Sequence, residues 1–76
     1  FEKAPNLVKP ADMMYQFGLF LYEGEGDDKC FKEVARYFKF SADKGNIKAM
    51  YNYGIMLSEG EGVDKDLKKA AHYFKL

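Results

Sequence analysis

The 76-residue chain has little of several features that would point to particular classes of protein. Its single cysteine, Cys30, excludes an internal disulfide, and with the one histidine, His72, it cannot supply the three or four ligands of a zinc site. Twelve basic and twelve acidic residues leave no net charge, which argues against a nucleic-acid-binding surface. No apolar run approaches the roughly 18 residues of a membrane span, so direct membrane insertion is not expected.

The composition indicates a folded chain. Hydrophobic residues make up 47% of the sequence and aromatic residues 17%, which is enough for a packed core and too apolar for a disordered segment. A chain of this size buries only about 60% of its unfolded surface, so its stability should be marginal. We therefore expect it to fold if its apolar faces are covered.

The sequence repeats itself after 36 residues. When residues 11–40 are aligned with residues 47–76, 15 of the 30 pairs are identical, and the longest shared run is Glu-Gly-Glu-Gly. A period between 20 and 50 residues is typical of repeat proteins, in which each unit buries its apolar face against the next. The repeat therefore predicts stacked copies of one small structural unit.

Each copy contains two stretches with apolar or small residues at positions i, i+3, i+4 and i+7, which is the spacing of one helical face. These stretches predict helices near residues 11–23, 29–44, 47–59 and 65–76. The sequence therefore predicts an all-α fold with two helices in each copy.

Residues between these helices match known helix ends. Gly24 and Gly60 are predicted to stop helices in the left-handed conformation, and Gly45 followed by Asn46 offers a stop for one helix and a cap for the next. Asp66 can cap the last helix.

Two glycines fall inside predicted helices. Glycine costs about 1 kcal/mol relative to alanine there, so Gly18 and Gly54 should be compensated by close packing. We expect them to lie against Ala35 and Ala71 of the facing helices, with phenylalanine and tyrosine side chains on either side.

These residues resemble a known family. The first helix of each copy is similar to that of a tetratricopeptide repeat, and the 36-residue period with its Gly-x-Gly loop resembles the related Sel-1-like repeat. The second copy carries most of that pattern, in Ala49, Tyr53-Gly54, Leu57, Gly60-Glu61-Gly62-Val63, Asp66, Lys69-Ala70-Ala71 and Tyr73-Phe74.

The resemblance implies an α-solenoid of antiparallel helix pairs that coils into a right-handed superhelix. Residues 11–46 would form the first Sel-1-like repeat and residues 47–76 a second, truncated repeat. Residues 1–10 are interpreted as the end of a preceding repeat.

The sequence offers little catalytic or ligand-binding chemistry. The Gly-x-Gly pairs lack the third glycine and the Gly-Lys-Ser/Thr run of phosphate-binding loops, and Asp64-x-Asp66 lacks the later glycine and glutamate of a calcium loop. His72 is equivalent to Arg36, which indicates a solvent-facing position, and Cys30 is interpreted as a structural thiol. We expect no catalytic residue, no metal and no cofactor.

The resemblance also suggests a binding surface, because the first helix of every tetratricopeptide pair lines the concave side where peptides bind. The candidates by position are Asp12, Tyr15, Leu19, Tyr22, Lys48, Tyr51, Ile55 and Ser58. Tyr15 and Tyr51 could instead pack between repeats, and Gln16 and Asn52 could either bind a peptide backbone or face solvent.

The function implied by the resemblance is a non-catalytic adaptor or scaffold that binds a protein or peptide partner. The alternative is a regulatory or substrate-docking segment of a larger enzyme, and the flanking sequence of the full polypeptide would separate the two. Because two repeats are fewer than the roughly three usually needed for stability, the chain is also expected to self-associate through its exposed repeat ends.

Overall fold

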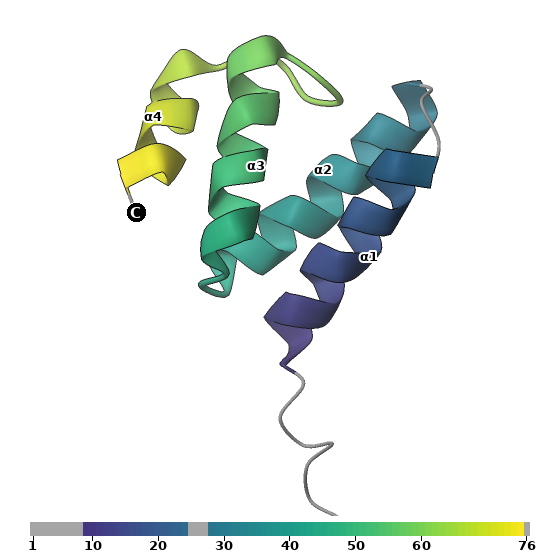
Figure 1. Ribbon diagram of the computed structural model, residues 1–76. Coiled ribbons are helices and arrows are strands. Elements are labelled where there is room, and N and C mark those ends of the chain that lie inside the picture. The colour runs from purple at the N-terminus through teal and green to yellow at the C-terminus, as the bar shows by residue number, and fades with distance from the viewer. Residues whose placement is uncertain (1–8, 25–27, 76) are drawn as a thin grey trace, which may run out of the picture.

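A computed structural model describes residues 9–24 and 28–75, with the side chains of residues 28–30 left out. The described chain forms four helices, which are α1 (Pro10–Gly24), α2 (Asp28–Asp43), α3 (Ile47–Glu59) and α4 (Leu67–Lys75) (Figure 1). Each bound lies within two residues of its prediction, and the all-α fold is confirmed. Residues 1–8, which belong to the segment interpreted as the end of a preceding repeat, lie outside the described residues, as do residues 25–27.

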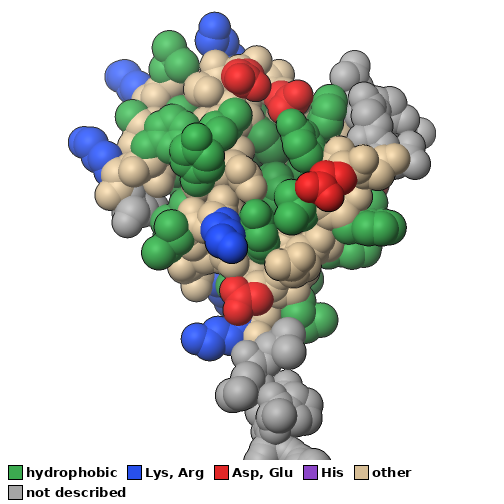
Figure 2. All heavy atoms as spheres, viewed as in Figure 1, with side chains coloured by type: hydrophobic (Ala, Val, Ile, Leu, Met, Phe, Trp, Pro, Cys, Tyr) green, Lys and Arg blue, Asp and Glu red, His purple; other side chains and the backbone are tan. Residues whose placement is uncertain are grey.

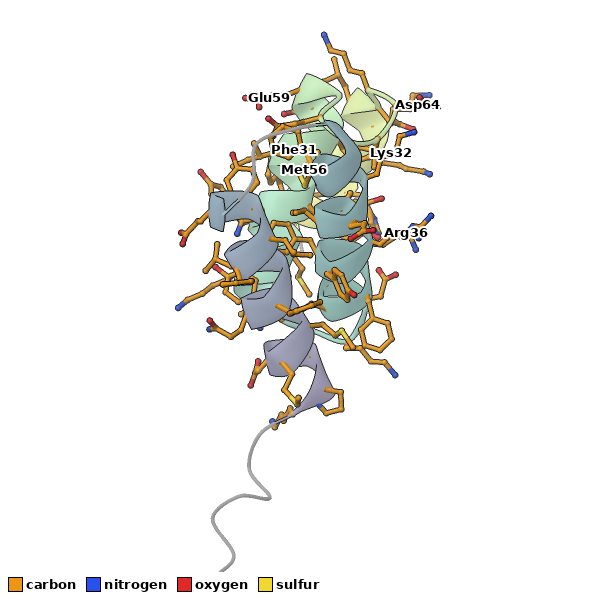
Figure 3. The ribbon with its side chains drawn as sticks, turned by 90° about the vertical axis from the view of Figure 1, so that its right-hand side faces the viewer. Phe31, Lys32, Arg36, Met56, Glu59 and Asp64 are labelled. Atoms are coloured by element: carbon orange, nitrogen blue, oxygen red, sulfur yellow. The ribbon has the colours of Figure 1, made fainter. Side chains whose placement is uncertain are left out.

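The helices follow one another as antiparallel neighbours. α1 packs on α2, α2 on α3, and α3 on α4, so the chain is two helix pairs stacked side by side (Figure 1). Figures 1 and 3 together show that α1 and α3 lie in one layer, and α2 and α4 in the other. Each pair therefore presents its first helix on the same side of the molecule.

The hydrophobic core lies at the junction between the two pairs. Its buried members come from α2, α3 and α4, and they are Val34, Ala35, Phe38, Tyr53, Met56, Leu57 and Ala70. Leu19 and Leu21 of α1 pack against this cluster, as does Val63 of the loop after α3. Because neither pair encloses a core by itself, the burial of apolar area that stabilises the fold depends on the stacking.

The turn between the pairs ends one helix and begins the next. Gly45 adopts a φ of 104°, which is unfavourable for residues with a side chain. The Asn46 side-chain oxygen accepts a hydrogen bond from the Ala49 amide at 2.8 Å, and its Nδ2 donates to Asp12 Oδ1 at 2.9 Å. The predicted stop and cap are confirmed, and Asn46 also ties the start of α3 to α1.

The other predicted helix ends differ in outcome. Gly60 is left-handed, with its amide donating to the Met56 carbonyl, and Asp66 Oδ1 accepts the Lys69 amide at 3.0 Å, so both predictions are confirmed. The prediction for Gly24 is wrong, because α1 continues through it and its φ is not positive. A glycine permits the left-handed conformation without requiring it.

The two glycines inside helices are sites of close packing, as predicted, but with a different partner. A Cβ atom at Gly18 would lie 3.0 Å from Cε1 of Phe38, and one at Gly54 would lie 2.6 Å from Cε1 of Phe74. The ring of a phenylalanine thus covers each glycine, and the alanines of the facing helices are not the nearest atoms. A flat ring gains contact area over a residue without a side chain.

The two pairs repeat each other in space as well as in sequence. Phe17 of α1 packs edge-to-face on Tyr37 of α2, with ring centroids 4.8 Å apart at 89°. The equivalent residues of the second pair, Tyr53 and Tyr73, make the same contact at 4.9 Å and 86°. Residues 36 positions apart can therefore be compared as structural equivalents.

One polar cluster joins the two pairs at the end of α2. The Tyr73 hydroxyl of α4 donates to Asp43 Oδ1 at 2.8 Å, and Lys39 Nζ donates to Asp43 Oδ2 at 3.1 Å. Burial acts to raise the pKa of Asp43, but the hydrogen bonds from Tyr73 and Lys39 outweigh it and lower that pKa below its usual value. Burial and the hydrogen bond to Asp43 raise the pKa of Tyr73 to about 12.

These shifts predict how the stability changes with pH. The Asp43 contribution is present above the unfolded pKa of about 3.9 and is lost as pH falls through the lower folded value. The Tyr73 contribution is present below pH about 10 and is lost as pH rises towards 12. Urea unfolding across pH should therefore show a smaller acid loss in Asp43→Asn, and a smaller alkaline loss in Tyr73→Phe, than in the unmodified chain.

Asp64→Asn is the matched control for the acid limb, because Asp64 is an exposed aspartate of the loop before α4. It should retain the full acid loss. An Asp43→Asn profile that coincides with that of Asp64→Asn at low pH would show that the cluster at the end of α2 does not link the two pairs energetically.

Candidate functional site

The candidate site is a groove between α1 and α3, on the face shown in Figure 2. On this face, apolar side chains run along the space between the two helices, and acidic side chains surround its upper part (Figure 2). Two hollows lie along the groove, one beside the turn before α3 and one towards the loop after α3. Both are lined by residues from the two pairs, so stacking is needed to form them.

The hollow near the loop, called here the loop hollow, has a volume of 140 Å³. It is lined by Leu19, Tyr22, Glu23, Phe38, Asn52, Ile55, Met56 and Glu61. Phe38 and Met56 belong to the buried core, while Leu19 and Ile55 are half-buried. The loop hollow therefore has an apolar interior with one amide and two carboxylates among its lining residues.

The hollow near the turn, called here the turn hollow, is larger and more polar, with a volume of 500 Å³. Its lining residues are Asp12, Tyr15, Gln16, Gly45, Asn46, Ile47 and Lys48. The hydrogen bond from Asn46 holds the Asp12 carboxylate in place, while Lys48 brings an exposed positive charge. This end of the groove thus carries both signs of charge.

Tyr15 lies between the two hollows and contributes to the packing of the pairs. Its ring stacks on Phe38 with centroids 5.6 Å apart, and it packs against the core. Asn52 Nδ2 of α3 donates to the Tyr15 hydroxyl at 3.5 Å, a long hydrogen bond across the groove. Tyr15 is therefore half-buried, although it also lines the turn hollow.

The structure separates the eight predicted surface residues into three groups. Asp12, Tyr15 and Lys48 line the turn hollow. Leu19, Tyr22 and Ile55 line the loop hollow. Tyr51 and Ser58 line neither hollow.

Tyr51 and Ser58 have other contacts. Tyr51 is exposed, and its ring lies 5.9 Å from that of Phe74 in α4. The Ser58 hydroxyl donates to the Ile55 carbonyl of its own helix at 2.8 Å. Six of the eight predicted residues therefore line the groove. Asn52 lines it as well, for which the sequence left open either a contact with a peptide backbone or a position facing solvent.

Sequence reasoning missed the two carboxylates of the loop hollow. Glu23 follows Tyr22 at the end of α1, and Glu61 lies in the loop after α3. A helical-face argument cannot place Glu61, because it lies outside any helix. The signal available was the shared Glu-Gly-Glu-Gly run, in which Glu61 is the third residue.

Acidic side chains gather at the loop end of the groove. In Figure 3, Glu59 at the end of α3 lies on the side of the groove, while Lys32 and Arg36 of α2 lie on the other side. With Glu23 and Glu61, the loop end of the groove therefore has an acidic surround, although the chain as a whole has no net charge. Such a field attracts positively charged groups of a partner.

The described part of the chain shows neither a metal-ligand cluster nor a membrane span. Within residues 9–24 and 28–75, no three histidine, cysteine, aspartate or glutamate side chains gather closely enough to hold a metal ion. None of the four helices in that part is long and apolar enough to cross a membrane. His72 is exposed, and the side chain of Cys30 lies outside the described residues.

Comparison with known proteins identifies the repeat. A family model described as Sel1 repeat matches residues 47–76. The crystal structure of a Sel1 repeat protein from Oxalobacter formigenes is similar to the chain, with a TM-score of 0.76 and 33% sequence identity over 99% of this chain. The chain spans about 30% of the length of that protein. No curated protein matches the sequence.

Sel1 repeats are in general protein-interaction modules and are typically non-catalytic. The likeness in structure covers both helix pairs, whereas the family model covers the second pair only. The matched model shows that residues 47–76 are a Sel1 repeat, and the shared fold shows that both helix pairs have the architecture of a Sel1 repeat protein.

Proposed function

We propose that this chain is a non-catalytic adaptor module that binds an extended segment of a partner protein in the groove between α1 and α3. The observation that supports this most directly is the loop hollow, whose apolar interior is open to solvent between two helices. A hollow of 140 Å³ is large enough for one apolar side chain and too small for most cofactors. The groove is therefore suited to a peptide.

The polar groups of the groove suggest how such a peptide would be held. The Asn52 side chain can donate to and accept from a peptide backbone, and it already spans the groove to Tyr15. Glu23 and Glu61 would attract a lysine or arginine next to the buried apolar side chain. We therefore expect the preferred segment to pair one apolar residue with a basic one.

A random-sequence peptide library selected on the chain tests this proposal. Selected peptides should be enriched in an apolar residue beside lysine or arginine, and their binding should shift the amide resonances of Leu19, Asn52 and Ile55. Ile55→Glu places a carboxylate in the apolar hollow and should weaken a selected peptide at least tenfold, about 1.4 kcal/mol. Leu67→Glu, on α4 outside the groove, is the matched control and should bind as the unmodified chain does.

Charge reversal tests the recognition of the basic residue. Glu23→Lys together with Glu61→Lys should weaken the same peptides and remove most of the salt dependence of binding. Glu33→Lys on α2, an exposed glutamate that does not line the groove, should have little effect. Peptides that bind Ile55→Glu as tightly as the unmodified chain would place the binding surface outside the groove.

A further inference from the structure

An apolar surface on α1 is left largely exposed by the described chain. Met13, Phe17 and Phe20 are 58%, 46% and 69% exposed, and they line a hollow of 580 Å³ together with Tyr37 of α2. This surface, called here the α1 face, lies apart from the loop hollow, which takes other residues of α1. Three large apolar side chains side by side on one helix are unusual for a surface in contact with water only.

The second helix pair shows what covers such a face. The residues 36 positions later are Ala49, Tyr53 and Met56 of α3, and they are only 0%, 5% and 2% exposed. Tyr53 and Met56 belong to the core cluster at the junction where α2 of the first pair packs on α3. The structural equivalent of the α1 face is thus covered by a helix that belongs to the neighbouring pair.

The other end of the stack presents a face of the matching kind. Leu67 and Phe74 of α4 are 62% and 48% exposed, and Ala71 is exposed beside them. Their equivalents in α2 are Phe31, Ala35 and Phe38, of which the last two are 2% exposed and belong to the core. Leu67, Ala71 and Phe74, called here the α4 face, therefore correspond to the side of α2 that packs on α3.

We propose that the α4 face of one copy packs on the α1 face of a second copy, as α2 packs on α3 within each chain. Both halves of the contact are present and exposed in the same molecule, and the internal junction supplies its geometry. Compared with the internal junction, the two faces also differ in side-chain size, and the two differences compensate each other. Phe20 replaces the smaller Met56 on one side, and Leu67 replaces the larger Phe31 on the other.

The compensation matters because these positions belong to one packed region. Phe31 packs against the core cluster that contains Met56, and Figure 3 labels both residues near the loop end of the molecule. Exchange of a large and a small residue across a contact conserves its volume, which packed interfaces tolerate well. The contact is head-to-tail and leaves one free face at each end, so it adds copies in an open-ended row.

Sedimentation of the unmodified chain, of two variants and of their mixture tests the proposal. The mass of the unmodified chain should rise with concentration above the 8.8 kDa of one copy. Phe20→Glu destroys the α1 face and Leu67→Glu destroys the α4 face. Each variant alone keeps one face but has no copy with the complementary face, so each should sediment as a monomer. Mixed together, they should form a dimer of two unlike copies, because each retains the face that the other lacks.

The control is Ile47→Glu, which also replaces an exposed apolar residue by glutamate but lies on neither face. It should associate as the unmodified chain does. Met13→Glu and Ala71→Glu repeat the mixing test at a second position in each face, and far-ultraviolet circular dichroism checks that every variant stays helical. These positions are exposed, so folding should be retained.

Other outcomes would overturn the proposal. An unmodified chain that remains a monomer at millimolar concentration has no such contact. Association of Phe20→Glu alone would show a contact that does not use the α1 face, and association of Leu67→Glu alone would show one that does not use the α4 face. A mixture that stays monomeric although each single variant has lost association would indicate a two-fold contact in place of the head-to-tail one.

Discussion

Phe38→Ala is expected to lower the free energy of unfolding by about 3–5 kcal/mol, the usual cost of removing a buried phenylalanine from a core. Phe38 is almost fully buried, its ring covers Gly18, and it stacks on Tyr15. The cavity that remains cannot collapse easily, because Val34 and Met56 around it are held by both pairs. Since small domains have only about 5–15 kcal/mol in total, this loss is a large fraction of the stability.

The chain contains its own control for this variant. Phe74 lies at the equivalent position and covers Gly54 in the same way, but it is half-exposed. Phe74→Ala should therefore cost about 1–2 kcal/mol, in proportion to the apolar area it buries. Urea unfolding at low protein concentration, followed by circular dichroism, measures both. Equal losses would show that burial by the neighbouring pair adds nothing to the stability.

Gly62→Ala is expected to destabilise the fold by about 3 kcal/mol, from two causes that add. Gly62 has a φ of 76°, which a residue with a side chain adopts at a cost of about 1 kcal/mol or more. A Cβ atom there would also lie 2.6 Å from the carbonyl carbon of Phe31. The Phe31 carbonyl belongs to the backbone near the start of α2. Neither it nor the loop that contains Gly62 can move aside without disturbing the contact between the loop and the first pair.

Two other glycines separate these causes. Gly45 has a φ of 104° but no heavy atom near its added Cβ, so Gly45→Ala should show the conformational cost alone, about 1–2 kcal/mol. Gly24 has no positive φ, and no heavy atom of the described residues lies near its added Cβ, so Gly24→Ala should leave the stability unchanged or raise it by up to about 1 kcal/mol. The urea midpoint should be highest for Gly24→Ala, lower for Gly45→Ala and lowest for Gly62→Ala. A Gly62→Ala midpoint equal to that of Gly45→Ala would refute the steric contribution.

Most of the fold could be predicted from local chemistry. The helix bounds follow from apolar spacing, and the Gly45-Asn46 turn follows from one residue that tolerates positive φ and one that caps a helix. Both signals depend on residues a few positions apart, so they can be recognised without knowledge of the rest of the molecule. Gly24 shows the limit of this reasoning, because its sequence context is that of Gly60 while its conformation is not.

The candidate groove could be predicted only in part. The face on which Leu19 and Ile55 lie follows from the repeat and from its resemblance to peptide-binding arrays, and both residues line the loop hollow. The sequence does not predict that Tyr15 and Tyr51 differ in burial, because the two occupy equivalent positions in the repeat. Tyr15 is half-buried by packing between the pairs, whereas Tyr51 is exposed next to α4.

The sequence by itself determined the four helices of the described chain, the caps at Asn46, Gly60 and Asp66, and the equivalence of the two copies, because periodicity and capping are properties of neighbouring residues. Only the tertiary structure decided which copies of an equivalent residue are buried. Met56 is buried and Phe20 is exposed, although the repeat assigns them the same position. The physical reason is that burial depends on the neighbour that a face meets, and only α3 has a helix pair packed on that side within the described chain.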